Sequence, residues 1–314
     1  MPPSDEGGGL PSGKTEGETL SNKNLFSHRT RVIYDIVPHR KEPFMFDLHV
    51  HTIHSADGRQ TVEEACEAAI RRGLRGIAVC DHADMWFSEK LNTPAEIRAC
   101  MEDVRRARRI YGDRLEILQG VEMAEYLDDP EGADRILSQE GFDVVLGSVH
   151  SLRLEDIDDS YSRVDFSEMP EEQIHRFMKK YFFLMSEMIE KTDFDVLTHL
   201  TCPLRYVNGK YKRGVDPLCF EKEILTVFGQ IIEKDIPLEL NTSGIHSFYG
   251  RYMPDPSLLR AYADMGGRLI TVASDAHAPQ YIGNAFPEAR ALLRELGFDA
   301  YCVFRKRKLF QYGF

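Results

Sequence analysis

The sequence predicts an α/β fold in which about seven strand and helix units close into a barrel. Two observations predict this fold. Short apolar runs rich in Val, Ile and Leu, typical of buried parallel strands, alternate with helical patterns. Each run also leads into a polar residue, and polar residues at strand ends must converge to form one site. Strand ends of a ring meet above a shared centre, whereas seven strands in an open sheet would spread across about 30 Å.

The seven expected strands share this apolar-to-polar transition. In chain order they are Phe46 to His51, Gly76 to Cys80 before Asp81-His82, Ile117 to Val121 before Glu122, Val144 to Val149 before His150, Val196 to Thr198 before His199, Leu238 to Leu240 before Asn241, and Leu269 to Ser274 before Asp275. An eighth apparent strand, 301–304, precedes the basic run 305–308, which we interpret as a solvated run of charge.

The intervening helices have recognisable start signals. Thr61 and Glu64 form a possible capping box, and Thr93-Pro94 is a typical opening for the next helix. A helix over about 170–191 carries an apolar stripe that we assign to the core: Ile174, Phe177, Met178, Tyr181, Phe182, Met185 and Ile189. Further helices are expected over about 217–234, 255–265 and 285–296.

Composition narrows the class of protein. The 314 residues, 42% of them hydrophobic, suit one large core, whereas residues 1–24 have little to bury and are expected to form a disordered extension. We find no signal-peptide centre and no apolar run of about 18 residues, so we expect a cytoplasmic protein without membrane spans. The net charge of −12 argues against nucleic acid as a partner. Six scattered cysteines predict reduced thiols, and the oligomeric state stays open.

The polar residues at the strand ends are metal-ligand types. His49 and His51 lie two apart on a strand, so their imidazoles project from the same face. Seven more candidates follow along the chain: Asp57, His82, Glu122, His150, His199, Asp275 and His277. Nine nitrogen and oxygen ligands exceed what one ion needs, and no Cys joins the set. Two or three divalent ions of the Zn, Mn or Fe type are therefore expected.

These motifs resemble a known family. Asp47 to Thr52, Asp81-His82, Gly120 to Glu122, Gly147 to His150 and Ser274 to His277 are similar to the motifs of the PHP superfamily, named for polymerase and histidinol phosphatase. The resemblance covers about residues 44–314, which we take as the barrel domain. Within the superfamily, Leu240 to Gly244 and the chain length are most similar to the histidinol-phosphate phosphatases. The resemblance implies a distorted (β/α)7 TIM-like barrel with a trinuclear metal site at the C-terminal ends of the strands.

The resemblance also implies how the ligands divide among three ions. One ion would be held by His49, His51, Glu122 and Asp275, the second by Asp57, His82 and His277, and the third by Glu122, His150 and His199. Glu122 would then bridge two ions. Glu122, Asp275 and His277 are the ligands expected to be essential for catalysis.

Other residues near the ligands are candidates for secondary roles. Arg205 and, more weakly, Arg163 could bind the phosphoryl group of a small substrate, or could be ordinary surface residues. Asn241 could hydrogen-bond to substrate or to a ligand, or could cap a turn. Asp47 and Asp81 could orient imidazoles as acceptors or cap local backbone.

The resemblance, together with the chemistry of the candidate ligands, implies a metal-dependent phosphomonoesterase. Phosphate monoesters hydrolyse so slowly that enzymes accelerate them by up to about 10²¹-fold, and metal binding lowers the pKa of water from about 15.7 to about 7. Histidinol phosphate is the expected substrate. A PHP phosphoesterase acting on a nucleotide, a phosphopeptide or another small phosphate is the alternative, and a non-catalytic metal-binding regulatory module is the third. The segment 152–166 is a long insertion of unassigned role.

Overall fold

Seven parallel strands form the centre of the protein. The computed structural model describes residues 34–37, 45–86, 94–139, 141–155 and 157–314. The central strands lie in the order β11-β10-β9-β6-β5-β3-β2, and β4 (His82–Asp84) pairs beside them with β5. Their bounds are β2 Phe46–Val50, β3 Gly76–Val79, β5 Glu116–Ala124, β6 Val144–Ser148, β9 Val196–Leu197, β10 Leu238–Asn241 and β11 Ile270–Ala273.

The sheet curls until its two edges meet. Val50, at the end of β2, forms a parallel bridge with Ala276, which follows β11. The amide of His51 donates to the carbonyl of Ala276 at 3.0 Å. The strands therefore form a nearly closed parallel barrel, as the alternating pattern predicted.

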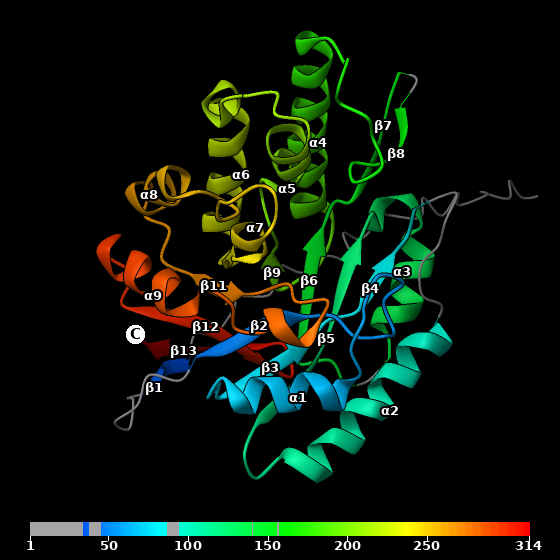
Figure 1. The fold of residues 1–314 in the computed structure, drawn as a ribbon, viewed down its shortest axis with the longest axis vertical. Helices are drawn as coiled ribbons and strands as arrows, with labels where there is room; N and C mark the ends of the chain where they lie inside the picture. Colours follow the sequence, from blue (N-terminus) through cyan, green and yellow to red (C-terminus); the bar gives the residue numbers. More distant parts are fainter. Residues whose placement is uncertain (1–33, 38–44, 87–93, 140, 156) are drawn as a thin grey trace, which may run out of the picture.

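Helices surround the barrel in Figure 1 and are its second layer. The longer ones are α1 Val62–Arg71, α2 Pro94–Tyr111, α3 Pro130–Leu137, α4 Glu171–Lys191, α6 Glu221–Glu233, α8 Pro256–Asp264 and α9 Phe286–Glu295. Short helical turns complete the connections: η1 Tyr126–Asp128, α5 Cys202–Leu204, η2 Arg205–Lys210, η3 Pro217–Phe220, α7 Ser243–His246 and η4 Pro279–Tyr281. The capping box of Thr61 and Glu64 is confirmed, with both reciprocal hydrogen bonds present. Thr93 lies outside the described residues.

The apolar stripe of α4 is confirmed as core. All seven predicted residues are buried, and Tyr181, Phe177 and Phe182 are among the largest fully buried side chains. The sequence pattern did not reveal α3, whose Asp129 accepts a hydrogen bond from the Gly132 amide at its start.

The insertion 152–166 forms much of a hairpin over the mouth of the barrel. Its strands are β7 Ser151–Leu154 and β8 Ile157–Ser160, which pair antiparallel. The amide of Tyr161 donates to the carbonyl of His150 at 3.0 Å, so the hairpin returns directly onto the end of β6.

The opposite end of the barrel is covered by the C-terminal hairpin, β12 Ala300–Arg305 and β13 Lys308–Gly313, with β1 Tyr34–Val37 parallel to β13. The interpretation of 305–308 as a solvated run is wrong for its two arginines. Arg305 binds Glu116 and Arg307 binds Asp195, both at 2.8 Å. The tight turn aims alternate side chains at the barrel, so only Lys306 and Lys308 are exposed.

Two composition-based expectations can be compared with the structure. All six cysteines have free thiols, as expected. Within the described ranges, no helix is long and apolar enough to cross a membrane. The extension predicted over residues 1–24 lies outside those ranges.

Candidate metal centre

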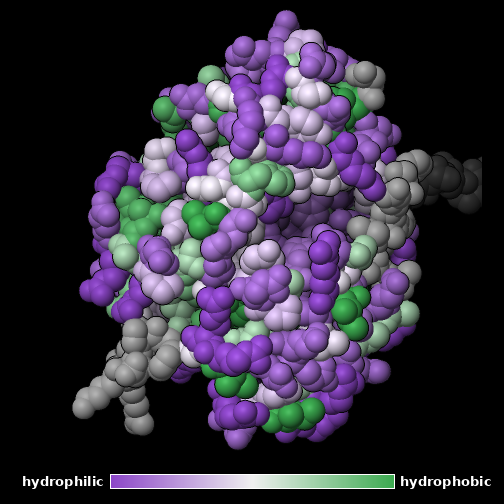
Figure 2. Space-filling model, in the orientation of Figure 1, coloured by the Kyte–Doolittle hydropathy of each residue, from purple (hydrophilic) through white to green (hydrophobic). Residues whose placement is uncertain are grey.

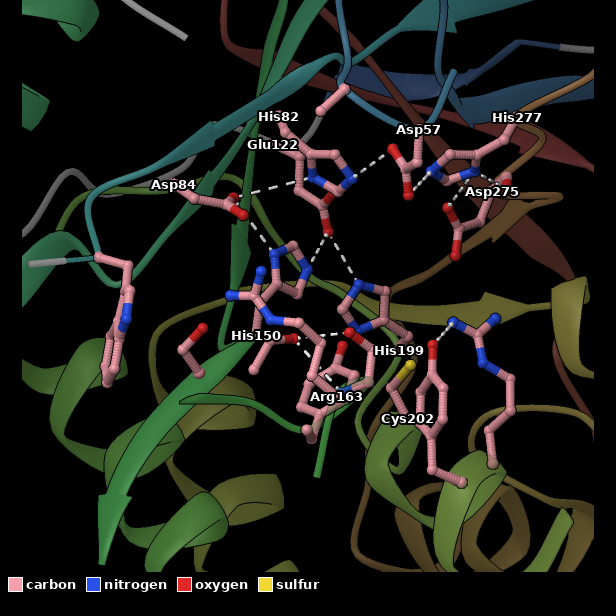
Figure 3. A pocket seen from close by; sticks show the side chains of 18 residues that line it. Asp57, His82, Asp84, Glu122, His150, Arg163, His199, Cys202, Asp275 and His277 are labelled. Atoms are coloured by element: carbon pink, nitrogen blue, oxygen red, sulfur yellow. Dashed lines mark hydrogen bonds and ion pairs between the residues drawn. The ribbon is translucent and has the colours of Figure 1, made fainter. Parts of the chain in front are cut away.

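All nine predicted ligands converge at the carboxyl ends of the strands. Figure 3 labels those that line the cavity: Asp57, His82, Glu122, His150, His199, Asp275 and His277. The nine ligands come from strand ends and from the loops directly beyond: His49 and His51 at the end of β2, Asp57 in the following loop, His82 on β4, Glu122 on β5, His150 after β6, His199 after β9, and Asp275 and His277 after β11. Most are buried, while Asp57 is 64% exposed at its side chain.

The first ligand group contains His49, His51 and Asp275, whose donor atoms lie within 4.8 Å of one another. Nε2 of His51 is 2.9 Å from Nε2 of His49 and 3.3 Å from a carboxylate oxygen of Asp275. Glu122 Oε2 completes the group at 3.3 Å from His49 Nε2. Two imidazole nitrogens that face each other and two carboxylates are a favourable donor set for a divalent cation.

The second group is more open than the first. His51, His82 and His277 place donor atoms within 4.8 Å of one another. Asp57 lies at the outer edge, 3.6 Å from His82 Nε2 and 3.3 Å from His277 Nε2. The expected trio of Asp57, His82 and His277 is therefore together, and His51 lies between the first and second groups.

The third group corresponds to the expected set of Glu122, His150 and His199. Glu122 Oε1 is 3.1 Å from His150 Nε2 and 2.8 Å from His199 Nε2. The other oxygen, Oε2, faces the first group and is 2.9 Å from His82 Nδ1. One carboxylate thus presents an oxygen to each side, which is the arrangement that a bridging ligand requires.

Charge is concentrated strongly at this centre. Burial alone would raise the pKa of Glu122, but His150, His49 and His82 outweigh burial and lower it well below its usual value. Burial lowers the pKa of His150, but Glu122 and Asp84 outweigh burial and raise it well above 6.5. Burial and then neighbouring His277 and His82 lower the pKa of His51 to about 3. Such strongly shifted groups gathered in one cleft are typical of a functional site.

Asp47 does not orient an imidazole. Its carboxylate accepts from the amide and hydroxyl of Ser274 and from the amide of Gly283, so it caps the loop after β11. Desolvation by burial raises its pKa to about 6. The capping alternative is therefore the one that the geometry supports.

Asp81 positions the imidazole of His51 indirectly, through the hydroxyl of Ser55. It accepts from the hydroxyl of Ser55 at 2.6 Å, and that hydroxyl lies 3.0 Å from Nδ1 of His51. It also accepts from the amide and hydroxyl of Thr52. Asp81 therefore combines backbone capping with indirect positioning of His51.

Two acceptors that sequence analysis missed contact imidazoles directly. Glu239 Oε2 is 2.9 Å from His49 Nδ1, and Asp84 Oδ1 is 3.2 Å from His150 Nδ1. Each fixes the ring so that Nε2 faces the metal groups. Glu239 did leave a signal, because a carboxylate inside the apolar strand Leu238–Leu240 requires a buried partner.

A cavity of about 230 Å³ opens directly over the ligands. Figure 2 shows a hydrophilic hollow near the centre of the face in view. Arg205 and Arg163 both line the cavity. Arg205 donates to the hydroxyls of Ser243 and Tyr206, and Arg163 forms an ion pair with Asp159 at 2.6 Å. Two cationic side chains therefore face the space beside the ligand groups.

Asn241 is fully buried and is not among the residues that line the cavity. Its amide donates to Glu239 at 2.8 Å and to Asp275 at 3.3 Å, and its oxygen accepts from Ser243. The hydrogen bond to Asp275 agrees with the alternative that Asn241 contacts a candidate ligand, and contact with substrate stays a prediction. Two ligand-related carboxylates occupy its donor group.

The family model of the PHP domain matches residues 47–243. The chain belongs to this family. It is 25% identical to a probable histidinol-phosphatase of Thermotoga maritima over 84% of this chain and 97% of the relative, and 26% identical to one of Clostridium acetobutylicum over 86% and 100%. It is also 25% identical to a protein of Thermoanaerobacter named only a probable phosphatase, over 81% of this chain and 86% of that relative.

Solved structures support the fold assignment. The structure of a histidinol phosphate phosphatase of Lactococcus lactis, in complex with zinc, L-histidinol and phosphate, superposes with a TM-score of 0.70. It is 20% identical, and the match covers 84% of this chain and 98% of that one. The PHP barrel inferred from the strand-end motifs is therefore confirmed.

Proposed function

We propose that this protein is a metal-dependent phosphomonoesterase that hydrolyses L-histidinol phosphate to L-histidinol and inorganic phosphate. The convergence of nine nitrogen and oxygen donors around the bridging carboxylate Glu122 carries this proposal. The family membership and the relatives named probable histidinol-phosphatases support the substrate assignment. In this proposal the enzyme acts in histidine biosynthesis in the cytoplasm.

The donor set fits two or three divalent ions of the Zn, Mn or Fe type. It combines imidazole nitrogens and carboxylate oxygens in overlapping groups, which such ions bind well. Glu122 would be shared between the first and third groups. When bound, the ions supply hydroxide at neutral pH, because coordination lowers the pKa of water to about 7.

Neighbouring side chains hold the candidate ligands in position for this chemistry. Glu239 and Asp84 hold the rings of His49 and His150 with Nε2 facing inward. Asp275 is held from the other side by Asn241. These contacts fix the ligands before substrate arrives, so little reorganisation is needed during the reaction.

Arg205 would bind the phosphoryl group. Its side chain is half-buried, and Nε has no hydrogen-bond partner among the described residues. A planar donor with unused capacity beside a metal centre suits two oxygens of a phosphoryl group. Arg163 would assist from the hairpin side of the cavity.

The reaction exchanges one bond to phosphorus for another. The oxygen of water forms a new bond to phosphorus, the bond from phosphorus to the alcohol oxygen breaks, and the alcohol leaves with a proton. Glu122, Asp275 and His277 would contribute by holding the ions against the phosphoryl group. No covalent enzyme intermediate is required.

A phosphatase for another ester is the second candidate. The relative named only a probable phosphatase supports it, because the two chains share 25% identity over 81% of this chain. A panel of phosphomonoesters, assayed with added Mn or Zn, separates the candidates. L-histidinol phosphate should have the highest kcat/KM, and a nucleotide or phosphotyrosine peptide that exceeds it would reassign the substrate. Absence of phosphate release from every ester would favour a non-catalytic metal-binding module.

A further inference from the structure

A second cavity of about 200 Å³ adjoins the metal cavity. It lies between η1, the junction of β6 and β7, and helix α4, and it shares Trp86 and Ser151 with the metal cavity. Its wall is largely apolar and includes Leu127, Val149, Leu152, Leu184 and Met188. Nothing in the mechanism above uses this space.

A buried carboxylate faces this second cavity. Glu125 is 9% exposed, and its Oε1 accepts from the amides of His150 and Ser151 at 2.5 and 2.8 Å. Its other oxygen, Oε2, has no hydrogen-bond partner among the described residues. Buried carboxylate oxygens are normally paired, so Oε2 is a position where a ligand donor would bind well.

Three other charged residues line this cavity: Asp128 is exposed, while Arg153 and Lys180 contact other side chains. Arg153 forms an ion pair with Asp158 and lies 4.9 Å from the ring of Trp86. The ammonium of Lys180 lies 5.0 Å from the exposed ring of Phe183. Glu125 is therefore the buried charged group on the wall of the second cavity.

The two cavities are also linked through one ligand. The ring of His150 belongs to the third metal group, while its backbone amide donates to Glu125. Neither cavity alone, at about 230 and 200 Å³, reaches the roughly 300 Å³ of a typical ligand pocket, whereas together they do.

We propose that the second cavity binds the alcohol half of the phosphate ester, with a protonated amine of that alcohol at Glu125. The inference rests on the proposed function, because it requires a phosphoryl group at the metal centre. The chain of the alcohol passes Ser151 and Trp86 and lies against the apolar wall. The second cavity thereby selects esters of an amino alcohol that carries an apolar or aromatic group.

The first test fills the cavity from helix α4. Leu184→Trp places a larger side chain in the cavity, and Phe183→Trp is the matched control, because the neighbouring Phe183 is 53% exposed. We compare kcat/KM for L-histidinol phosphate, which carries an amine, with kcat/KM for glycerol phosphate, which does not. The ratio of the two values should fall about tenfold or more in Leu184→Trp and stay unchanged in Phe183→Trp.

The second test changes the acceptor. Glu125→Gln keeps an oxygen for the two backbone amides but replaces Oε2 with a donor, which cannot bind an ammonium. Calorimetry of L-histidinol binding to the metal-loaded protein in the presence of phosphate should show affinity about tenfold to a hundredfold weaker, with metal content unchanged.

The outcomes separate the two proposals. If the wild-type protein hydrolyses neither ester, the proposed function fails. If it hydrolyses L-histidinol phosphate but Leu184→Trp preserves the ratio and Glu125→Gln preserves L-histidinol affinity, the alcohol lies elsewhere and this inference is wrong. Inhibition by L-histidinol that is not competitive with the substrate would instead make the second cavity a separate effector site, which also overturns the inference.

Discussion

The two ends of the barrel differ in how their charged side chains are paired. At the closed end, the cations have partners within the protein: Arg305 binds Glu116, Arg307 binds Asp195, and Arg75 lies 4.7 Å from the ring of Tyr312. At the open end, imidazoles crowd one another, and the nitrogens of His49 and His51 are 2.9 Å apart. The charged groups at the closed end are paired within the protein, whereas the open end gathers imidazoles and carboxylates into groups that could hold metal ions.

This contrast indicates that stability and function are separated along the barrel axis. Arginine pairs and aromatic rings at the closed end hold the C-terminal hairpin to the strands. Histidines and carboxylates at the open end are held in mutual contact by Glu239, Asp84 and Asp81. Substitutions at the two ends should therefore affect different measurements.

The largest effect is expected for Glu122→Gln. An amide cannot neutralise two ions, so the variant should lose bound metal and nearly all phosphatase activity. Metal analysis of the purified protein and phosphate release measure the two losses. Full metal occupancy with near-normal turnover would show that Glu122 does not bridge.

Arg205→Ala should leave the metal content intact and weaken phosphoryl binding. Loss of a charge-assisted contact costs about 1.5 to 3 kcal/mol, or roughly tenfold to more than a hundredfold in kcat/KM. Arg163→Ala is the comparison, and its effect should be smaller because Arg163 is half exposed and paired with Asp159. Unchanged kinetics in Arg205→Ala would remove this residue from the site.

Metal affinity should fall as the pH falls. Burial would lower the pKa of His82, but Asp84 and Glu122 outweigh it and raise the pKa to about 9 in the metal-free protein. His82 therefore holds a proton below about pH 9, and a metal must displace it. Each displaced proton weakens apparent affinity by about tenfold per pH unit. Zinc titration against a chelator at several pH values from 6.5 to 8.5 measures the slope, and no slope would contradict this ionisation.

Arg305→Ala tests the closed end. It removes contacts to Glu116 and Tyr312 and packing against Phe310, so unfolding free energy should fall by about 1 to 2 kcal/mol while kcat/KM stays unchanged. Lys308→Ala is the matched control, because Lys308 is exposed in the same turn and should change stability by less than about 0.5 kcal/mol. Denaturant unfolding provides both values. A loss of activity in folded Arg305→Ala would mean that the two ends are coupled.

The smallest effect is expected for deletion of residues 1–24. The sequence of this segment has little apolar area to bury and contains no candidate ligand. Thermal melting and turnover should match those of the full chain. A melting temperature lowered by several degrees would show that the segment packs on the barrel.

The strands and the set of candidate ligands could be predicted from local patterns in the sequence. Period-two spacing places His49 and His51 on one face, and apolar runs that end on His, Asp or Glu predict a shared edge. The apolar stripe of α4 and the capping box of α1 could also be predicted, because each depends on residues a few positions apart in the sequence.

Which polar residues meet depends on how the strands are arranged in three dimensions. Glu239 contacts His49 across 190 positions of the chain, and Asp47 reaches Ser274 across 227. Arg305 of the basic run is half-buried and paired with Glu116 because barrel closure brings the C-terminal hairpin under the strands. Local spacing carries no information about such pairs, since their distance is set by the order and register of seven strands rather than by any repeat in the sequence.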